Sequence, residues 1–332
     1  ASDGVRIGQW DLNQSRMKDI PFFVPSLGEQ TQIARFVDWK TSQINRFIRN
    51  KRKLIDLLQE QRSNMIDVAV LGGYQRNEIV ERSGSEAITS AIKIPWLHNI
   101  PRHWKIVPAK SLFSVRNERA RSDDQQLSAT QAYGVIPQKQ FEGLVRRRVV
   151  QIFQHLEKRR HVEPDDFVIS MRSFQGGLER AWVRGCIRSS YVILKPGDSV
   201  DVEFFSFLLK SSRYVGALQQ TSDFIRDGQD LNFHNFCLVD LPLVPLEEQW
   251  MIADYLKTAT KNVDAAISRA KHEIELMCEY LTRLISDVVT GQVDVRGIEV
   301  PEVAEDDRQA QDEDAAESDD VIDDEGDMDE AD

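Results

Sequence analysis

The stretch Glu248–Gly291, EQWMIADYLKTATKNVDAAISRAKHEIELMCEYLTRLISDVVTG, decides the fold because an earlier stretch matches it. That earlier stretch is Glu29–Gly72, EQTQIARFVDWKTSQINRFIRNKRKLIDLLQEQRSNMIDVAVLG. The two align without a gap and share the Glu-Gln start, the Gly end and many apolar positions between them. An Asp-Leu-Asn triplet precedes each copy at the same distance, at residues 11–13 and 230–232. A match of this length predicts an internal repeat of a larger unit.

Apolar residues of the later copy recur in alternating steps of four and three, the heptad pattern of a helix that packs along a seam. These residues are Val263, Ile267, Ala270, Ile274, Met277, Leu281, Leu284 and Val288. The earlier copy has the same seam with two cations in it, Lys51 and Arg62. An amphipathic helix of roughly 28 residues, about 40 Å long, needs a partner for its apolar stripe. We therefore expect the two copies to pair, since unrelated bundle helices would not require matching ends.

Length and composition indicate a protein of the cell interior. The 332 residues are enough for two domains, or for one domain with long helices. No apolar run is long enough for a transmembrane helix, and the start of the chain shows no signal-peptide pattern. The start also lacks Met, which suggests a processed, engineered or truncated product. The three cysteines have no paired metal-ligand spacing, so we expect a reduced, cytoplasmic compartment.

The net charge of −12 hides two regions of opposite sign. From Glu302 to the end there are 17 acidic residues and one Arg, so this extension carries −16 and the remainder +4. We expect the acidic extension to be disordered, and hypothesise that it mimics DNA and restrains non-specific binding. Between Lys93 and Gly228, 22 basic and 14 acidic residues give +8. Such a basic region suits nucleic acid, although acidic protein partners are also compatible with it.

The region between the two copies has a mixed pattern. Short β-branched and aromatic runs predict strands at residues 167–171, 181–183 and 191–194, with a turn at Pro164–Asp166. Val202–Leu218 is predicted to form one helix packed on that sheet. The fold class is therefore α+β.

Four features then occur in order along the chain. They are the opening Ile94-Pro95-Trp96-Leu97 with Ile100-Pro101 and His103-Trp104, the segment Pro164–Gly177, the helix entry Leu241-Pro242 to Glu248-Gln249, and the end Val289-Thr290-Gly291. Together with the duplicated helix, this order resembles the specificity subunit of type I restriction–modification enzymes. The resemblance covers about residues 10 to 298 and excludes the acidic extension.

The resemblance implies a mixed α/β target recognition domain with two long antiparallel coiled-coil helices. The expected organisation is a remnant of a first recognition domain (1–28), a first spacer helix (29–73), a linker (74–92), a recognition domain (93–247), a second spacer helix (248–292), and an exit segment with the acidic extension (293–332). Two departures from the family are the near absence of the first recognition domain and the unusual segment Gly185–Tyr191. The chain is therefore expected to read one half of a bipartite DNA target, to work as a pair of truncated copies, or to be a fragment.

The expected role is recognition without catalysis. The sequence has no Asn/Asp-Pro-Pro-aromatic methyltransferase motif and no Walker loop, and His234 with Cys237 is too small a set for a metal site. By resemblance, the partners are double-stranded DNA, the methyltransferase subunits and the restriction subunit, with no membrane. S-adenosylmethionine, Mg and ATP are expected only in those partner subunits.

Candidate DNA-binding residues follow from chemistry, since arginine and amide side chains read base edges and cations contact phosphates. The first candidate is the loop with Arg172, Ser173, Gln175 and Gly176; its alternative is a turn in which Arg172 pairs with Asp165 or Asp166. The phosphate candidates are Arg146, Arg147, Arg148, Lys158, Arg159 and Arg160, which could equally be solvated charge runs. A third cluster has Arg116, Asn117, Arg119 and Arg121, and Arg226, Gln229 and Asn232 are further candidates.

Two other functions stay open. The chain could be a non-enzymatic coiled-coil scaffold whose basic domain binds an acidic protein. It could also be an enzyme with an unrecognised site. Sequence-selective DNA binding, absent from a scaffold at any salt concentration, separates the first of these from a specificity subunit.

Overall fold

The protein is described here by a computed structural model that covers residues 2–6, 9–12, 24–73, 79–81, 96–97, 99–145, 158–170, 173–221 and 233–302. The chain forms two units, unit 1 with residues 1–57 and 266–332, and unit 2 with residues 58–265. The acidic extension and its predicted disorder lie outside the described residues from residue 303 onward. In the part that the structure covers, no helix is apolar over a length that would cross a membrane.

Two helices of 44 residues each, α2 (Leu27–Val70) and α8 (Leu246–Val289), begin and end at positions that match in the repeat. Their starts are built alike. Gln30 Nε2 donates to the carbonyl oxygen of Pro25 at 2.9 Å, and Gln249 Nε2 donates to that of Val244 at 2.7 Å. The shared glutamine therefore forms a hydrogen bond to the backbone five residues before it, ahead of the first turn of each helix.

The ends of the two helices are also alike. Gly72 and Gly291 take left-handed backbone conformations with φ values of 83° and 77°. The next amide then donates back to a carbonyl of the last turn, Gly73 N to Val68 O at 2.8 Å and Gln292 N to Asp287 O at 2.8 Å. This closure is typical of a Schellman cap, for which glycine is the favoured residue. The left-handed backbone at each helix end therefore explains why Gly recurs at this position of the repeat.

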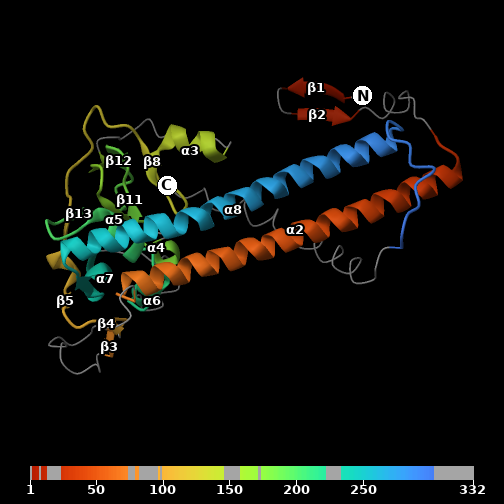
Figure 1. Ribbon diagram of the computed structural model, residues 1–332. Coiled ribbons are helices and arrows are strands. Elements are labelled where there is room, and N and C mark those ends of the chain that lie inside the picture. Colours follow the sequence, from red (N-terminus) through yellow and green to blue (C-terminus); the bar gives the residue numbers. More distant parts are fainter. Residues whose placement is uncertain are drawn as a thin grey trace. The chain divides into compact units, whose positions relative to one another are not determined.

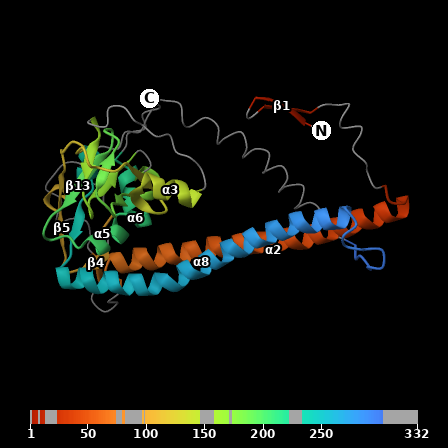
Figure 2. The ribbon, with the colours of Figure 1, turned by 90° about the horizontal axis from the view of Figure 1, so that it is seen from above.

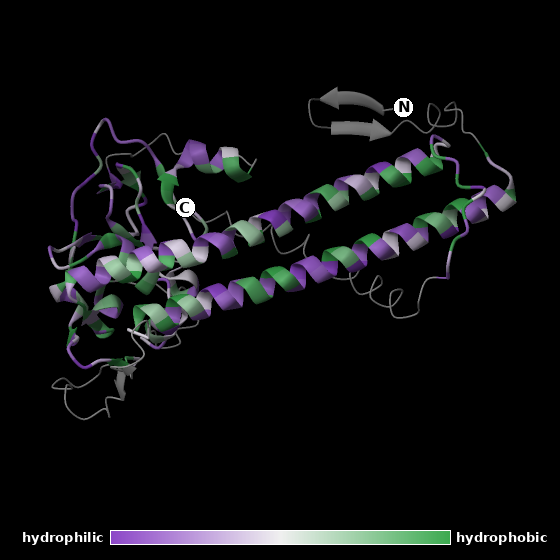
Figure 3. Cartoon of the chain, in the orientation of Figure 1, coloured by the Kyte–Doolittle hydropathy of each residue, from purple (hydrophilic) through white to green (hydrophobic). Residues whose placement is uncertain are grey.

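In unit 1 the two helices lie side by side and antiparallel (Figures 1 and 2). Lys51 of α2 contacts Glu273 of α8, and Phe36 near the start of α2 packs with Val288 near the end of α8. Apolar residues of the predicted seam are buried, namely Ile44, Ile48, Ile55, Ile267 and Ala270. Patches of hydrophobic residues recur among hydrophilic ones along both helices (Figure 3), as expected for apolar residues spaced three and four apart.

The segment that follows α8 folds back onto the start of α2 within unit 1. Gln32 Nε2 donates to the carbonyl oxygens of Val295 at 3.0 Å and Ile298 at 2.7 Å. The side chain of Val295 joins the small apolar cluster of Phe36 and Val288. Unit 1 also contains an antiparallel hairpin of β1 (Ser2–Arg6) and β2 (Gln9–Leu12).

In unit 2 the helices are again antiparallel. Arg62 Nε lies 2.7 Å from Asp264 Oδ1. The last turns of α2 and the first turns of α8 enter one apolar core, through Ile66, Ala69, Val70, Ile252, Ala253 and Leu256.

The rest of unit 2 is a mixed domain of short strands and helices. Its four-stranded antiparallel sheet has the order β11 (Glu179–Arg180), β10 (Phe167–Ile169), β13 (Val192–Pro196) and β6 (Phe113–Val115). Four antiparallel pairs accompany it: β3 (Ile79–Glu81) with β4 (Asn99–Pro101), β5 (Lys105–Val107) with β14 (Leu241–Leu243), β7 (Leu127–Thr130) with β8 (Gly134–Pro137), and β9 (Arg160–Val162) with β12 (Gly185–Ile187). The helices are η1 (Ala109–Ser111), α3 (Gln138–Val145), α4 (Ser173–Gly176), α5 (Val202–Leu208), α6 (Ser212–Gln219) and α7 (Phe233–Leu238).

The opening of this domain is fastened to α8. Trp104 Nε1 donates to Glu248 Oε2 at 2.9 Å, and His103 Nε2 lies 2.6 Å from Glu248 Oε1. Trp96 Nε1 donates to the carbonyl oxygen of Asp240 at 2.8 Å. The opening motif is therefore bonded to the start of α8 through His103 and Trp104, and to Asp240 ahead of that helix through Trp96.

Two local predictions need correction. The single helix predicted at Val202–Leu218 is two helices, because Ser211 caps a new start by accepting from the amide of Tyr214. The strand predicted at residues 181–183 is displaced to Glu179–Arg180, and Ala181 makes only an isolated bridge to Val135. The turn predicted at Pro164–Asp166 is confirmed, with Asp165 at a φ of 70°.

Candidate nucleic-acid interface

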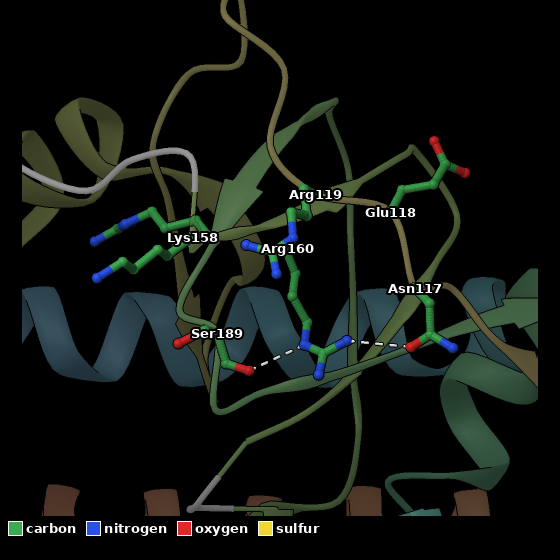
Figure 4. Close-up of a pocket in the computed structure, with 7 residues that line it drawn as sticks. Asn117, Glu118, Arg119, Lys158, Arg160 and Ser189 are labelled. Carbon is green, nitrogen blue, oxygen red and sulfur yellow. Dashed lines mark hydrogen bonds between the residues drawn. The ribbon is translucent and has the colours of Figure 1, made fainter.

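A basic pocket lies where three segments of unit 2 meet. The antiparallel pair of β9 and β12 and an isolated bridge between Arg119 and Arg160 bring these segments together. The pocket has a volume of about 460 Å³. It is lined by Asn117, Glu118, Arg119, Lys158, Arg159, Arg160 and Ser189 (Figure 4). Five of these seven residues are predicted DNA-binding residues, taken from two different clusters of the sequence.

Arg160 is held in a fixed position at the centre of this group. Its Nε donates to the carbonyl oxygen of Ser189 at 2.9 Å, and its Nη1 donates to Asn117 Oδ1 at 3.2 Å. Both acceptors are uncharged, so they orient the guanidinium without neutralising it. Ser189 escaped the sequence analysis because it contributes a backbone carbonyl, which any residue type would provide.

The one acidic residue of the pocket wall already has cationic partners. Glu118 Oε1 accepts from Arg116 at 2.7 Å, and Glu118 Oε2 accepts from Arg121 at 2.8 Å. Hydrogen bonds from Arg121 and Arg116 lower the pKa of Glu118, so it stays ionised and paired at neutral pH. The negative charge of Glu118 is therefore already balanced by Arg116 and Arg121.

Arg116 supports the fold in this structure. Its guanidinium forms two bonds to Asp166, Nε to Oδ2 at 2.7 Å and Nη2 to Oδ1 at 3.0 Å. Burial raises the pKa of Asp166, and the bonds from Arg116 oppose that rise. Asp166 in turn accepts from the amide of Glu163 at 2.8 Å, which closes the turn before β10. This pair could not be predicted from the sequence, because Arg116 and Asp166 are 50 residues apart in the chain.

A buried charge network lies next to Arg160 on β9. The ring of His161 is fully buried, with Nδ1 2.7 Å from Asp124 Oδ2 and Nε2 2.8 Å from Glu163 Oε1. Asp124 also accepts from the backbone amide of Arg121 at 2.8 Å and from Arg184 Nε at 3.2 Å. This network ties the segment around residue 121 to β9 and so fixes the pocket wall.

Within the predicted loop at residues 172–177, Ser173–Gly176 form the short helix α4. Arg172 lies outside the described residues. Ser173 is buried, and its Oγ accepts from the amide of Ser170 at 2.9 Å, while Gln175 is exposed. Asp165 pairs with Arg180 at 2.6 Å and Asp166 with Arg116, so the described residues already occupy the two carboxylates considered for Arg172.

Gly176 and its neighbour Gly177 fit tightly. A Cβ at Gly177, whose φ is 80°, would come within 2.1 Å of the carbonyl oxygen of Leu209. A Cβ at Gly176 would lie 2.9 Å from the side chain of Gln131. Glycine is therefore required at position 177, where the neighbour is backbone, whereas at position 176 the neighbour is the flexible end of Gln131.

Several predicted contacts cannot be placed. Arg146, Arg147, Arg148, Arg226, Gln229 and Asn232 lie outside the described residues. Within the described part of the chain, no group of three or more His, Cys, Asp or Glu residues is arranged to hold a metal ion.

An exposed aromatic group beside the β7–β8 turn was not predicted from the sequence. Trp182 Nε1 donates to the carbonyl oxygen of Tyr133 at 2.9 Å, and the guanidinium of Arg180 stacks 4.5 Å from the indole. Gly134 lies directly beneath the indole, because a Cβ there would come within 2.8 Å of Trp182 Nε1. The only sequence signal was a Tyr-Gly pair between two short strands.

Comparison with known proteins gives a distant resemblance. No protein-family profile matches the chain. Over 293 residues, 87% of the chain, it is 22% identical to the putative type I restriction enzyme MjaX specificity subunit of Methanocaldococcus jannaschii. The chain resembles type I specificity subunits. The match spans 63% of that relative's length. The resemblance predicted from the sequence is thereby confirmed.

Solved structures of such subunits also match. The HsdS subunit from Thermoanaerobacter tengcongensis matches with a TM-score of 0.38 and 17% identity, over 81% of this chain and 60% of that chain. The type I restriction–modification S subunit from M. genitalium matches with a TM-score of 0.36 and 14% identity, over 91% of this chain and 68% of that chain.

Proposed function

We propose that this chain is the DNA-recognition subunit of a type I restriction–modification complex, and that its domain in unit 2 reads one half of a bipartite DNA target. The observation that carries the proposal is the pocket in which Arg119, Lys158, Arg159 and Arg160 meet with one acidic residue that is already paired. Clustered cations beside a carboxylate that is already paired suit a polyanion such as duplex DNA. The similarity to a specificity subunit supports this assignment.

The sequence-reading side chains are proposed to lie outside the pocket. Gln175 is exposed on α4, and an amide side chain can donate to and accept from an adenine edge. Arg172 precedes it in the chain and suits guanine. Ser173 is buried, so we assign it to holding α4 in place.

Methylation and cleavage belong, in this proposal, to partner subunits that carry S-adenosylmethionine, Mg and ATP. An exposed apolar stripe in unit 1 suits the docking of the methyltransferase subunits. It consists of Phe47, Leu54 and Leu57 on α2 and Leu276 and Tyr280 on α8, which are between 36% and 55% exposed.

These five residues share one side of the helix pair. Lys51 Nζ lies 5.2 Å above the Phe47 ring and also contacts Glu273, so Phe47 and Glu273 face the same way. Leu54 follows Phe47 by about two helical turns, and Tyr280 follows Glu273 by about two turns. An apolar strip on a solvent-exposed helix pair is a mark of a protein interface.

Selection from a pool of random duplexes tests the proposal. The full chain, with its modification subunit, is expected to enrich one defined sequence, and raising the salt should weaken binding without changing that sequence. The alternative is an interaction scaffold, which the apolar stripe also favours. A scaffold would enrich no sequence at any salt concentration.

A further inference from the structure

The arginines of unit 2 differ in what holds them. Arg116 is bonded to Asp166, Arg180 to Asp165 and Glu203, and Arg184 to Asp123 and Asp124. Each of these guanidiniums has its charge matched by carboxylates. Arg160 is bonded instead to a backbone carbonyl and to the amide of Asn117, and the described residues provide it with no carboxylate. It is therefore positioned like a structural arginine but keeps its full charge.

The surroundings of Arg160 add charge of the same sign. Arg119, Lys158 and Arg159 line the same pocket, and none of them has an ion pair with a described carboxylate. In Figure 4, Glu118 points away from Arg160, in keeping with its bonds to Arg116 and Arg121. Arg119 and Lys158 are exposed and Arg159 and Arg160 are partly buried, so water screens their mutual repulsion only in part, and an anion that binds among them would relieve it.

The shape of the site selects the kind of anion. The cations line the walls of a concavity of about 460 Å³, so the ligand must protrude into it. In duplex DNA the phosphates are the outermost groups, whereas base edges lie at the floor of a groove and are read by protruding side chains. A guanidinium fixed through Nε and Nη1 still has Nη2 free to donate to phosphate oxygens.

We propose that this pocket is a phosphate clamp that takes one backbone phosphate of duplex DNA, with Arg160 as its central donor. The proposal rests on the proposed function and specifies it further. The pocket then supplies affinity and register, and the choice of sequence comes from other residues.

Asn117 is the positioning residue of this clamp. Its Oδ1 accepts from Arg160 Nη1, and its side chain is exposed, so substitutions there leave the core intact. Asn117→Asp changes one atom group and places a carboxylate against Arg160. The variant should neutralise the guanidinium in the way that Asp166 neutralises Arg116.

The test is the salt dependence of binding to a random-sequence duplex, measured with the full chain between about 50 and 200 mM salt. Arg160→Gln is expected to lower affinity about tenfold at low salt, and to reduce the slope of log affinity against log salt by about one. Asn117→Asp should reproduce both effects, and Asn117→Ala should give smaller ones. Arg283→Gln, which removes an exposed cation of α8, is the matched control and should leave the slope unchanged.

Three results would overturn the clamp. An unchanged slope in Arg160→Gln and Asn117→Asp, with normal binding by the wild type, would refute it and leave the proposed function standing. A change in the sequence selected by Arg160→Gln would mean that Arg160 reads a base. Stabilisation of the wild type by inorganic phosphate, lost in Arg160→Gln while DNA binding is kept, would assign the pocket to free phosphate. Absence of any DNA binding by the wild type would instead reject the proposed function itself.

Discussion

Lys51 Nζ lies 2.5 Å from Glu273 Oε2, between two helices whose predicted seam is apolar apart from Lys51 and Arg62. The seam positions Lys51 and Arg62 both carry cations, and each finds a carboxylate of α8, Glu273 or Asp264. These pairs fix which residues face each other, because sliding the helices would leave partly buried charges without partners. The two cations that interrupt the repeat therefore specify the register of the helix pair.

The first prediction concerns this register. Lys51→Glu places two carboxylates together and should destabilise the fold by about 1 kcal/mol or more, whereas Lys51→Leu should be nearly neutral. The double variant Lys51→Glu with Glu273→Lys should recover most of the loss. Denaturant unfolding measures all three, and a failure of the swap to restore stability would argue against the register role.

The second prediction uses the two helix ends as a matched pair. Gly72 and Gly291 both have positive φ, so alanine at either position should cost about 1 kcal/mol. A Cβ at Gly72 would also lie 2.3 Å from the ring of Pro101, while one at Gly291 meets nothing within 4 Å. Gly72→Ala should therefore lower the melting temperature clearly more than Gly291→Ala. Equal decreases in melting temperature would show that the Pro101 ring can move away from a Cβ at position 72 without destabilising the fold.

The third prediction concerns Glu179, whose side chain is 3% exposed and lies 2.6 Å from Lys210 Nζ. Burial raises the pKa of Glu179 to about 7, although Lys210 opposes the rise. Because the folded-state pKa exceeds the unfolded one, the group's stabilising contribution is present below pH 4.5 and is lost as pH rises through about 7.

Glu179→Gln removes this titration. Relative to the wild type, the variant should gain stability between about pH 5 and pH 8, by up to about 3 kcal/mol. Lys210 keeps a partner in the variant, since its Nζ donates to the carbonyl oxygen of Gln131 at 2.9 Å. Denaturant unfolding of the wild type and of Glu179→Gln at the two pH values measures this gain. A stability difference between the two proteins that does not change with pH would count against the raised pKa.

The fourth prediction tests the apolar stripe of unit 1. Phe47→Glu combined with Leu54→Glu should abolish co-purification with the modification subunit and leave helicity unchanged, because charges there cannot be buried in an interface. Arg52→Glu, at an exposed position of α2 that is not three or four residues from any residue of the stripe, is the control for charge and should bind normally. Undiminished binding of the double variant would place the docking surface elsewhere.

Local and repeating features of the fold were predictable from the sequence. The repeat located both long helices, and Gly72 and Gly291 marked their ends correctly. Pairings distant in sequence were not predictable. The Arg-rich segments gave no sign that Arg116 would meet Asp166 while Arg160 would meet Asn117 and Ser189. The split at Ser211 was missed because the apolar pattern continues across it.

The central claim is that this chain decides which DNA sequence is modified. Sequencing the methylated sites in cells that carry the chain with its modification partner tests this claim most directly. We predict methylation at one defined sequence that disappears when the chain is deleted. Methylation that persists unchanged without the chain, or that follows no sequence, would contradict the account.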